Sequence, residues 1–73
     1  MANEGINSAL SALFPMITAR LKRAHDIAAA AEACAESSNH EDAVRILLEI
    51  DQHTYEVTIL LNAMGLIRRE RDA

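Results

Sequence analysis

The stretch from Glu41 to Ile67 constrains the fold most, because its apolar residues form two neighbouring helical stripes. Apolar residues that recur at steps of three and four lie on one side of a helix. One stripe comprises Ala43, Leu47, Ile50, Val57, Leu61 and Met64, and the other comprises Ile46, Ile50, Val57, Leu60, Met64 and Ile67. Two adjacent stripes need two partner helices, since a single neighbour covers only one of them.

The first half of the chain predicts one of these partners. Its apolar residues alternate between steps of four and three, which keeps a single seam facing a neighbour in left-handed helix packing. Large side chains occupy the seam up to Leu21, and alanine occupies it from Ala24 onwards. The alanine end is therefore expected to pack more tightly. The seam comprises Leu10, Phe14, Ile17, Leu21, Ala24, Ala28, Ala31 and Ala35, with Leu13, Ile27 and Cys34 on its flank.

A proline interrupts this first helix, which is predicted over residues 7–36 with Asn7 or Ser8 as its cap. Pro15 removes a backbone donor and disfavours helical geometry at Phe14. The helix is therefore either broken there or continuous and kinked. We favour the kinked helix, because the apolar spacing does not slip across Pro15.

Residues 37–40, Ser-Ser-Asn-His, predict the turn between the two helices. Ser38 and Glu41 have the spacing of a capping box, so a second helix is predicted over residues 41–69. Gly65 either lies within that helix or caps it. A connection this short makes the two helices antiparallel, as a two-helix hairpin. The fold class is all-α, in a single domain over residues 1–73.

A 73-residue chain is expected to need help with its stability, because a domain of this size buries only about 60% of its unfolded surface. One cysteine excludes an internal disulfide. We therefore predict that two hairpins dimerise into a four-helix bundle. The predicted core comprises Leu10, Phe14, Ile17, Leu21, Leu47, Ile50, Val57, Leu60, Leu61, Met64 and Ile67.

Polar residues interrupt both stripes near the middle of the second helix. In a hairpin that turns at Ser38–Asn39, residues whose numbers sum to about 78 lie at the same level, so His25 is expected near His53. With Thr54 they are predicted to form a polar layer that fixes the register. The alternative is a pH switch, in which protonation charges this layer.

Catalytic and metal-binding patterns are not apparent in the sequence. Glu49, His53 and Glu56 share a helix face, but no Glu-x-x-His motif of the di-iron bundles occurs. Cys34 has no flanking cation that activates a thiolate, and is expected to be buried near the tight end. We predict no enzymatic activity, no cofactor and no metal site.

The predicted function is therefore a non-catalytic helical interaction module, a homodimeric small regulator, inhibitor or chaperone-like adaptor. Tyr55, Ile59 and Leu66 form the expected surface for a protein partner, because exposed apolar patches mark contact sites. Residues 10–17 or another protein would cover the apolar end of the second helix. The free cysteine indicates a cytoplasmic protein, and no apolar run approaches the length that spans a bilayer.

The alternative function is nucleic-acid binding through Arg20, Lys22, Arg23 and the tail Arg68–Arg71. Dimeric helical hairpins include the small RNA-binding protein Rop, which the predicted architecture resembles, although no motif is shared. The net charge of −4 disfavours this alternative, because phosphate binding depends on clustered Lys and Arg.

Overall fold

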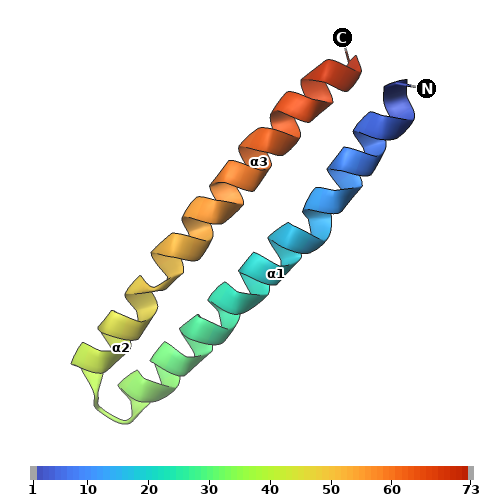
Figure 1. Cartoon of the computed structure of the whole chain (residues 1–73). Coiled ribbons are helices and arrows are strands. Elements are labelled where there is room, and N and C mark those ends of the chain that lie inside the picture. Colours follow the sequence, from blue (N-terminus) through green and yellow to red (C-terminus); the bar gives the residue numbers. More distant parts are fainter. Residues whose placement is uncertain (1, 73) are drawn as a thin grey trace.

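The computed structural model describes residues 2–72 and consists of helices joined by short connections (Figure 1). Helix α1 spans Ala2–Glu36, α2 spans His40–Leu48 and α3 spans Ile50–Asp72. No strand occurs between residues 2 and 72, so the predicted all-α class is confirmed. None of these helices is long and apolar enough to cross a membrane.

Helix α1 continues through Pro15, so the alternative of a broken helix is wrong. Proline removes a single hydrogen bond of the helix interior. The turns before it are held in place by Ile6, Leu10 and Leu13, which are partly buried. The helix also begins at Ala2 rather than at residue 7, and the expected caps, Asn7 and Ser8, lie inside it.

The second predicted helix is divided at Glu49 into α2 and α3. The Glu49 N–H donates to the Ile46 carbonyl over 3.1 Å, which is the tighter i→i−3 bond of a 3₁₀ turn. The backbone of Glu49 stays right-handed, with φ −64° and ψ −18°, so α3 continues the course of α2 (Figure 1). Gly65 lies inside α3, which runs on to Asp72.

The turn is built as a Schellman motif rather than the predicted capping box. Ser38 adopts a positive φ of 67°. Its N–H donates to the Ala35 carbonyl over 2.9 Å, and the Asn39 N–H donates to the Cys34 carbonyl over 3.1 Å. These are the two bonds of the motif, and they satisfy the last carbonyls of α1. The N-cap of α2 is Asn39, which makes no side-chain capping bond.

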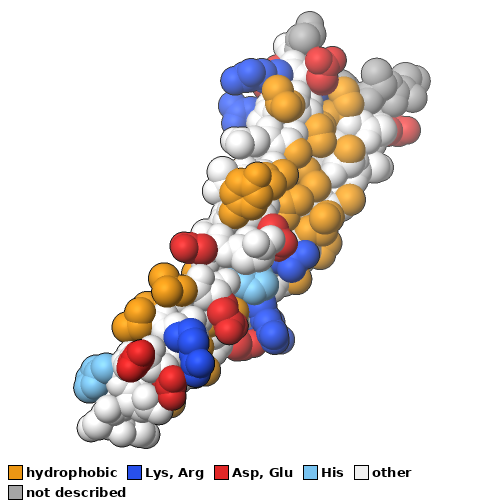
Figure 2. Space-filling view, turned by 60° about the vertical axis from the view of Figure 1, so that its left-hand side comes forward, with side chains coloured by type: hydrophobic (Ala, Val, Ile, Leu, Met, Phe, Trp, Pro, Cys, Tyr) orange, Lys and Arg blue, Asp and Glu red, His pale blue; other side chains and the backbone are white. Residues whose placement is uncertain are grey.

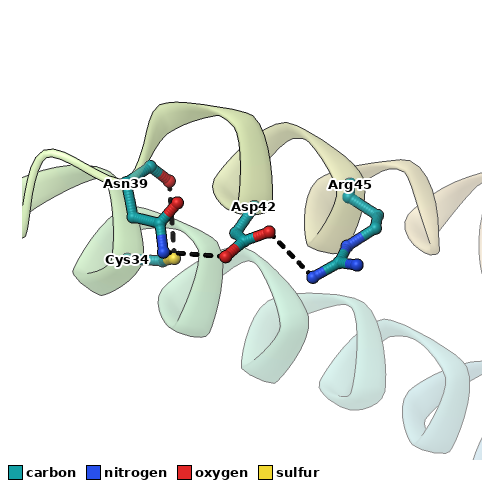
Figure 3. A network of polar contacts seen from close by, with 4 residues as sticks. All are labelled: Cys34, Asn39, Asp42 and Arg45. Carbon is teal, nitrogen blue, oxygen red and sulfur yellow. Dashed lines mark hydrogen bonds and ion pairs between the residues drawn. The ribbon is translucent and has the colours of Figure 1, made fainter.

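Side chains tie this turn to the first turn of α2 (Figure 3). The Asn39 Nδ2 donates to Asp42 Oδ2 over 2.7 Å, and Arg45 Nη2 donates to Asp42 Oδ1 over 2.8 Å. The Cys34 Sγ donates to the Asn39 carbonyl at 3.5 Å. The Asp42 carboxylate therefore accepts hydrogen bonds from both Asn39 and Arg45. The connection between α1 and α2 is short, and several hydrogen bonds hold it.

Beyond the turn the chain runs back alongside α1, so both ends of the chain lie at the same end of the molecule (Figure 1). Helix α1 packs against α2 and α3 along its length. The molecule is a rod of 57 × 15 × 12 Å with a radius of gyration of 17.0 Å. A compact domain of 73 residues has a radius of gyration of about 11 Å. Two helices lying side by side leave most side chains accessible to solvent.

Two seams of residues meet where the helices pack, one on α1 and one along α2 and α3. Each seam alternates between steps of three and four throughout, as in antiparallel coiled coils. On α1 the seam comprises Ile6, Leu10, Leu13, Ile17, Arg20, Ala24, Ile27, Ala31 and Cys34. On α2 and α3 it comprises Ala43, Ile46, Ile50, His53, Val57, Leu60, Met64 and Ile67.

Four of the predicted core residues lie outside this seam. Phe14 is 59% exposed and Leu21 52%, and Leu47 and Leu61 are also exposed. Every second residue of the observed α1 seam lies one position before the predicted one. Leu13 thus takes the place of Phe14 in the seam, and Ile27 takes the place of Ala28. Within the described chain, only Ile27, Ala31 and Ala43 are buried hydrophobic residues.

Candidate interaction surface

The four displaced core residues lie along one flank of the helix pair. On α1 this flank repeats every seven residues, and each member directly follows a seam residue. In an antiparallel pair such positions of the two helices border the same side of the contact. We call this flank the apolar face; it comprises Phe14, Leu21, Ala28 and Ala35 of α1 with Leu47, Thr54 and Leu61 of α2 and α3.

Each end of the apolar face carries an open groove. The groove near the chain ends has a volume of about 320 Å³, and it is lined by Asn7, Leu10, Ser11, Phe14, Met64, Arg68 and Arg71. The groove near the turn has a volume of about 280 Å³, and it is lined by Ala31, Glu32, Ala35, His40, Ala43, Val44 and Leu47. One groove therefore contains arginines, and the other contains a glutamate.

The space-filling view shows how side chains are distributed along one side of the rod (Figure 2). Hydrophobic side chains gather over the half nearer the chain ends. Charged side chains and histidines are more frequent over the half nearer the turn. On this side of the rod, the two halves thus differ in polarity.

The three residues of the predicted polar layer lie at different positions, His53 partly buried and His25 and Thr54 exposed. His53 lies in the seam, and its Nδ1 is buried without a hydrogen-bond partner. His25 is exposed instead of facing it. The Thr54 hydroxyl donates to backbone carbonyls of its own helix. Its oxygen lies 3.3 Å from the Ile50 carbonyl oxygen and 3.0 Å from that of Asp51. Only one histidine therefore interrupts the contact between the helices.

The basic cluster of α1 contacts α3 through a different residue from those expected. Residue numbers that sum to about 78 also place Lys22 and Arg23 near Glu56, but Arg20 makes the contact, with Nε 2.7 Å from Oε2 of Glu56. The Oε2 accepts no aligned hydrogen bond, so this contact is an ion pair. Lys22 and Arg23 are exposed.

The C-terminal arginines lie apart from that cluster. Arg68 and Arg71 each contact Asp72, at 3.7 Å and 3.4 Å. The Arg71 Nη1 also donates to Asn7 Oδ1 at 3.4 Å, which joins α3 to α1. Along the rod, Arg69 and Lys22 are separated by about 20 Å, given the helical rise of 1.5 Å per residue.

The predicted partner surface is exposed on α3. Tyr55 is 64% exposed, Leu66 60% and Ile59 47%. Leu66 also lines a shallow groove with Asn62, Gly65 and Arg69. These three side chains point away from the seam with α1, and are free to contact another molecule.

The residues considered for metal binding and thiol chemistry are Glu49, His53, Glu56 and Cys34. Between residues 2 and 72 no three His, Cys, Asp or Glu side chains come together as a metal site requires. In the Glu49, His53, Glu56 set, Glu56 is engaged by Arg20 and by Gln52, whose Nε2 lies 3.1 Å from Oε1. Cys34 is half-buried at the turn.

Comparisons of the chain with protein-family models, with curated proteins and with solved structures found no match.

Proposed function

We propose that this protein is a non-catalytic interaction module, a helical hairpin that dimerises into a four-helix bundle. The exposure of its large apolar side chains carries this proposal. Side chains that a folded domain normally buries are about half exposed or more, including Phe14, Leu21 and Leu61. Contiguous apolar surface of this kind marks a site of protein contact.

The accessible surface supports a dimer of ordinary interface size. The chain exposes 5525 Å². A folded monomer of its 8.0 kDa mass exposes about 4,450 Å². The excess of about 1,100 Å² is close to the roughly 800 Å² that each partner contributes to a stable interface.

The apolar face is the surface that a second chain covers in this proposal. Its members between Phe14 and Leu61 are uncharged, and the same seven-residue step on α3 leads on to Arg68 at one end of the face. The opposite flank holds Arg23 and Glu56, and the seam residue Arg20 pairs with Glu56 there, so this flank is more polar. Packing two apolar faces together would give each helix a second neighbour, as the two apolar stripes of the sequence require.

The outer side of α3 remains free in such a bundle. Tyr55, Ile59 and Leu66 would there bind a protein partner, which is the mode of action of small regulators, inhibitors and chaperone-like adaptors. An exposed tyrosine among aliphatic side chains suits this role, because tyrosine combines a large apolar ring with a hydrogen-bonding hydroxyl.

Thermal unfolding at several protein concentrations tests the dimer. Association stabilises by mass action, so the melting temperature of a folded dimer rises with concentration. We expect a rise of about 5–10 °C over about a hundredfold increase in concentration. A melting temperature independent of concentration contradicts the proposal.

Binding to nucleic acid is the competing outcome, through Arg20, Lys22, Arg23 and Arg68–Arg71. Fluorescence titration with RNA and DNA oligonucleotides at low and high salt separates the two functions. Phosphate binding weakens steeply with salt, whereas apolar docking does not. Our proposal predicts no saturable oligonucleotide binding at physiological salt, and tight binding that fails at high salt favours the alternative.

A further inference from the structure

The net charge of the chain is concentrated at one end of the rod. Residues 27–50, around the turn, contain five carboxylates and one arginine. The remaining residues contain six carboxylates and six Lys or Arg. The whole net charge of −4 therefore lies at the turn end, and the end that holds the chain termini carries the arginines 68, 69 and 71.

This polarity distinguishes the two ways in which two rods can pack side by side. In a parallel dimer the two acidic ends lie together, at the roughly 10 Å spacing of packed helices. In an antiparallel dimer they lie at opposite ends of a rod 57 Å long. That separation exceeds the Debye length of about 8 Å at physiological ionic strength, so the repulsion is screened.

The sizes of the α1 side chains on the apolar face show the same polarity. Phe14 and Leu21 lie on the half nearer the termini, and Ala28 and Ala35 lie on the half nearer the turn. Antiparallel packing about Leu21 sets the large Phe14 opposite the small Ala28, which fills space evenly. Parallel packing sets Phe14 against Phe14 and leaves the alanines facing one another across a gap, and unfilled space costs stability.

The two grooves are complementary in charge as well. The groove near the termini contains Arg68 beside Phe14, and the groove near the turn contains Glu32 beside Leu47. The two polar contacts between α1 and α3, Arg71 with Asn7 and Arg20 with Glu56, join residues whose numbers sum to 78 and 76, so residues with sums near these values lie at about the same level. A two-fold axis that crosses the face at Leu21 then brings Phe14 opposite Ala28 and Arg68 opposite Glu32.

We propose that the apolar face binds a second copy of this chain in the antiparallel orientation, about a two-fold axis at Leu21. Arg68 of each chain then faces Glu32 of the partner subunit, and Phe14 faces Ala28 of the partner subunit. This inference rests on the proposed dimer and adds its orientation and its pairing. The charge distribution selects the orientation, and the apolar face supplies the contact area.

Distances between spin labels test the orientation directly. The full chain carries Cys34→Ser and one exposed labelled cysteine, at Ser8 near the termini or at Arg23 near the middle. Circular dichroism and melting of each labelled protein show that it keeps its helices. The antiparallel dimer predicts a short Arg23–Arg23 distance and two Ser8 positions about 39 Å apart along the rod, since 26 helical residues at a rise of 1.5 Å separate them about an axis at Leu21.

The outcomes separate the orientation from the dimer itself. A short Ser8–Ser8 distance shows a parallel dimer, which overturns this inference and leaves the proposed function standing. The absence of any dipolar coupling between labels, in folded protein, overturns the proposed dimer and this inference with it.

Charge reversal checks the pairing of Arg68 with Glu32. Arg68→Glu and Glu32→Arg are each expected to weaken the dimer by about threefold to tenfold, and the double variant to restore it. Within one chain these residues lie about 33 Å apart along the rod. Restoration therefore requires contact between chains, and a double variant weaker than either single variant contradicts the pairing.

Discussion

Arg20 of α1 reaches across the helix contact to Glu56 of α3, with its Nε 2.7 Å from the Oε2 of the carboxylate. It is the ion pair that joins α1 to the returning helices within residues 2–72. Arg20 occupies a seam position between Ile17 and Ala24, where its neighbours along the seam are apolar. The ion pair thus links one level of α1 to one level of α3 at the middle of the rod.

A double-mutant cycle measures what this ion pair contributes. Both partners are partly exposed, the Arg20 side chain to 47% and that of Glu56 to 28%. Such pairs contribute about 0.2–1 kcal/mol, because solvent screens them. We expect a coupling energy in that range between Arg20→Ala and Glu56→Ala in chemical denaturation, decreasing in 1 M salt. A coupling of several kcal/mol contradicts this description.

Relieving the strained backbone of the turn is expected to stabilise the protein. Ser38 holds a left-handed φ of 67°, which costs a residue with a Cβ about 1 kcal/mol relative to glycine. Ser38→Gly should therefore raise the free energy of unfolding by about 0.5–1 kcal/mol, measured at fixed protein concentration. Ser38→Ala keeps the Cβ and serves as the control. An equal gain from both variants contradicts the strain.

Filling the polar position of the seam is also expected to stabilise the fold. The buried Nδ1 of His53 has no hydrogen-bond partner, and an unsatisfied buried polar group costs about 1–3 kcal/mol. His53→Leu should raise the free energy of unfolding by about 1 kcal/mol or more. The control Asn62→Leu adds the same side chain at an exposed position and should change stability by less than about 0.5 kcal/mol.

Charges introduced on two different faces should have different effects. Leu21→Glu places a carboxylate at the centre of the apolar face, and each dimer would then bury two of them. We expect dimer affinity to fall by more than about 100-fold, because a buried unpaired charge costs several kcal/mol. Tyr55→Glu, on the outer side of α3, should leave the dimer affinity within about threefold of the native protein. Size-exclusion chromatography with light scattering distinguishes the two variants.

The all-helical class was predictable because turn-forming residues are few and the apolar spacing is helical throughout. The frame of the seam was harder to predict. Leu13 and Phe14 are both large and apolar, so hydropathy does not decide which of them faces the partner helix. The prediction placed Leu21 in the seam rather than its neighbour Arg20. Arg20 can occupy that position because its guanidinium pairs with Glu56.

The details at the helix ends escaped prediction for a similar reason. Ser38 and Glu41 match a capping box, yet the same residues allow the Schellman motif, whose bonds are made by backbone groups that every residue carries. The division at Glu49 has no sequence signal, since no glycine or proline lies near it. The excess of carboxylates within residues 27–50 could be read from the sequence. It marks one end of the rod because the turn places these residues together.

Sedimentation equilibrium of the unlabelled chain at micromolar concentration tests whether the helix pair completes its core with a second copy. We expect a molar mass twice the 8.0 kDa of the chain, together with a helical circular dichroism spectrum. A fully helical, cooperatively melting protein with a mass of 8.0 kDa at that concentration would contradict it.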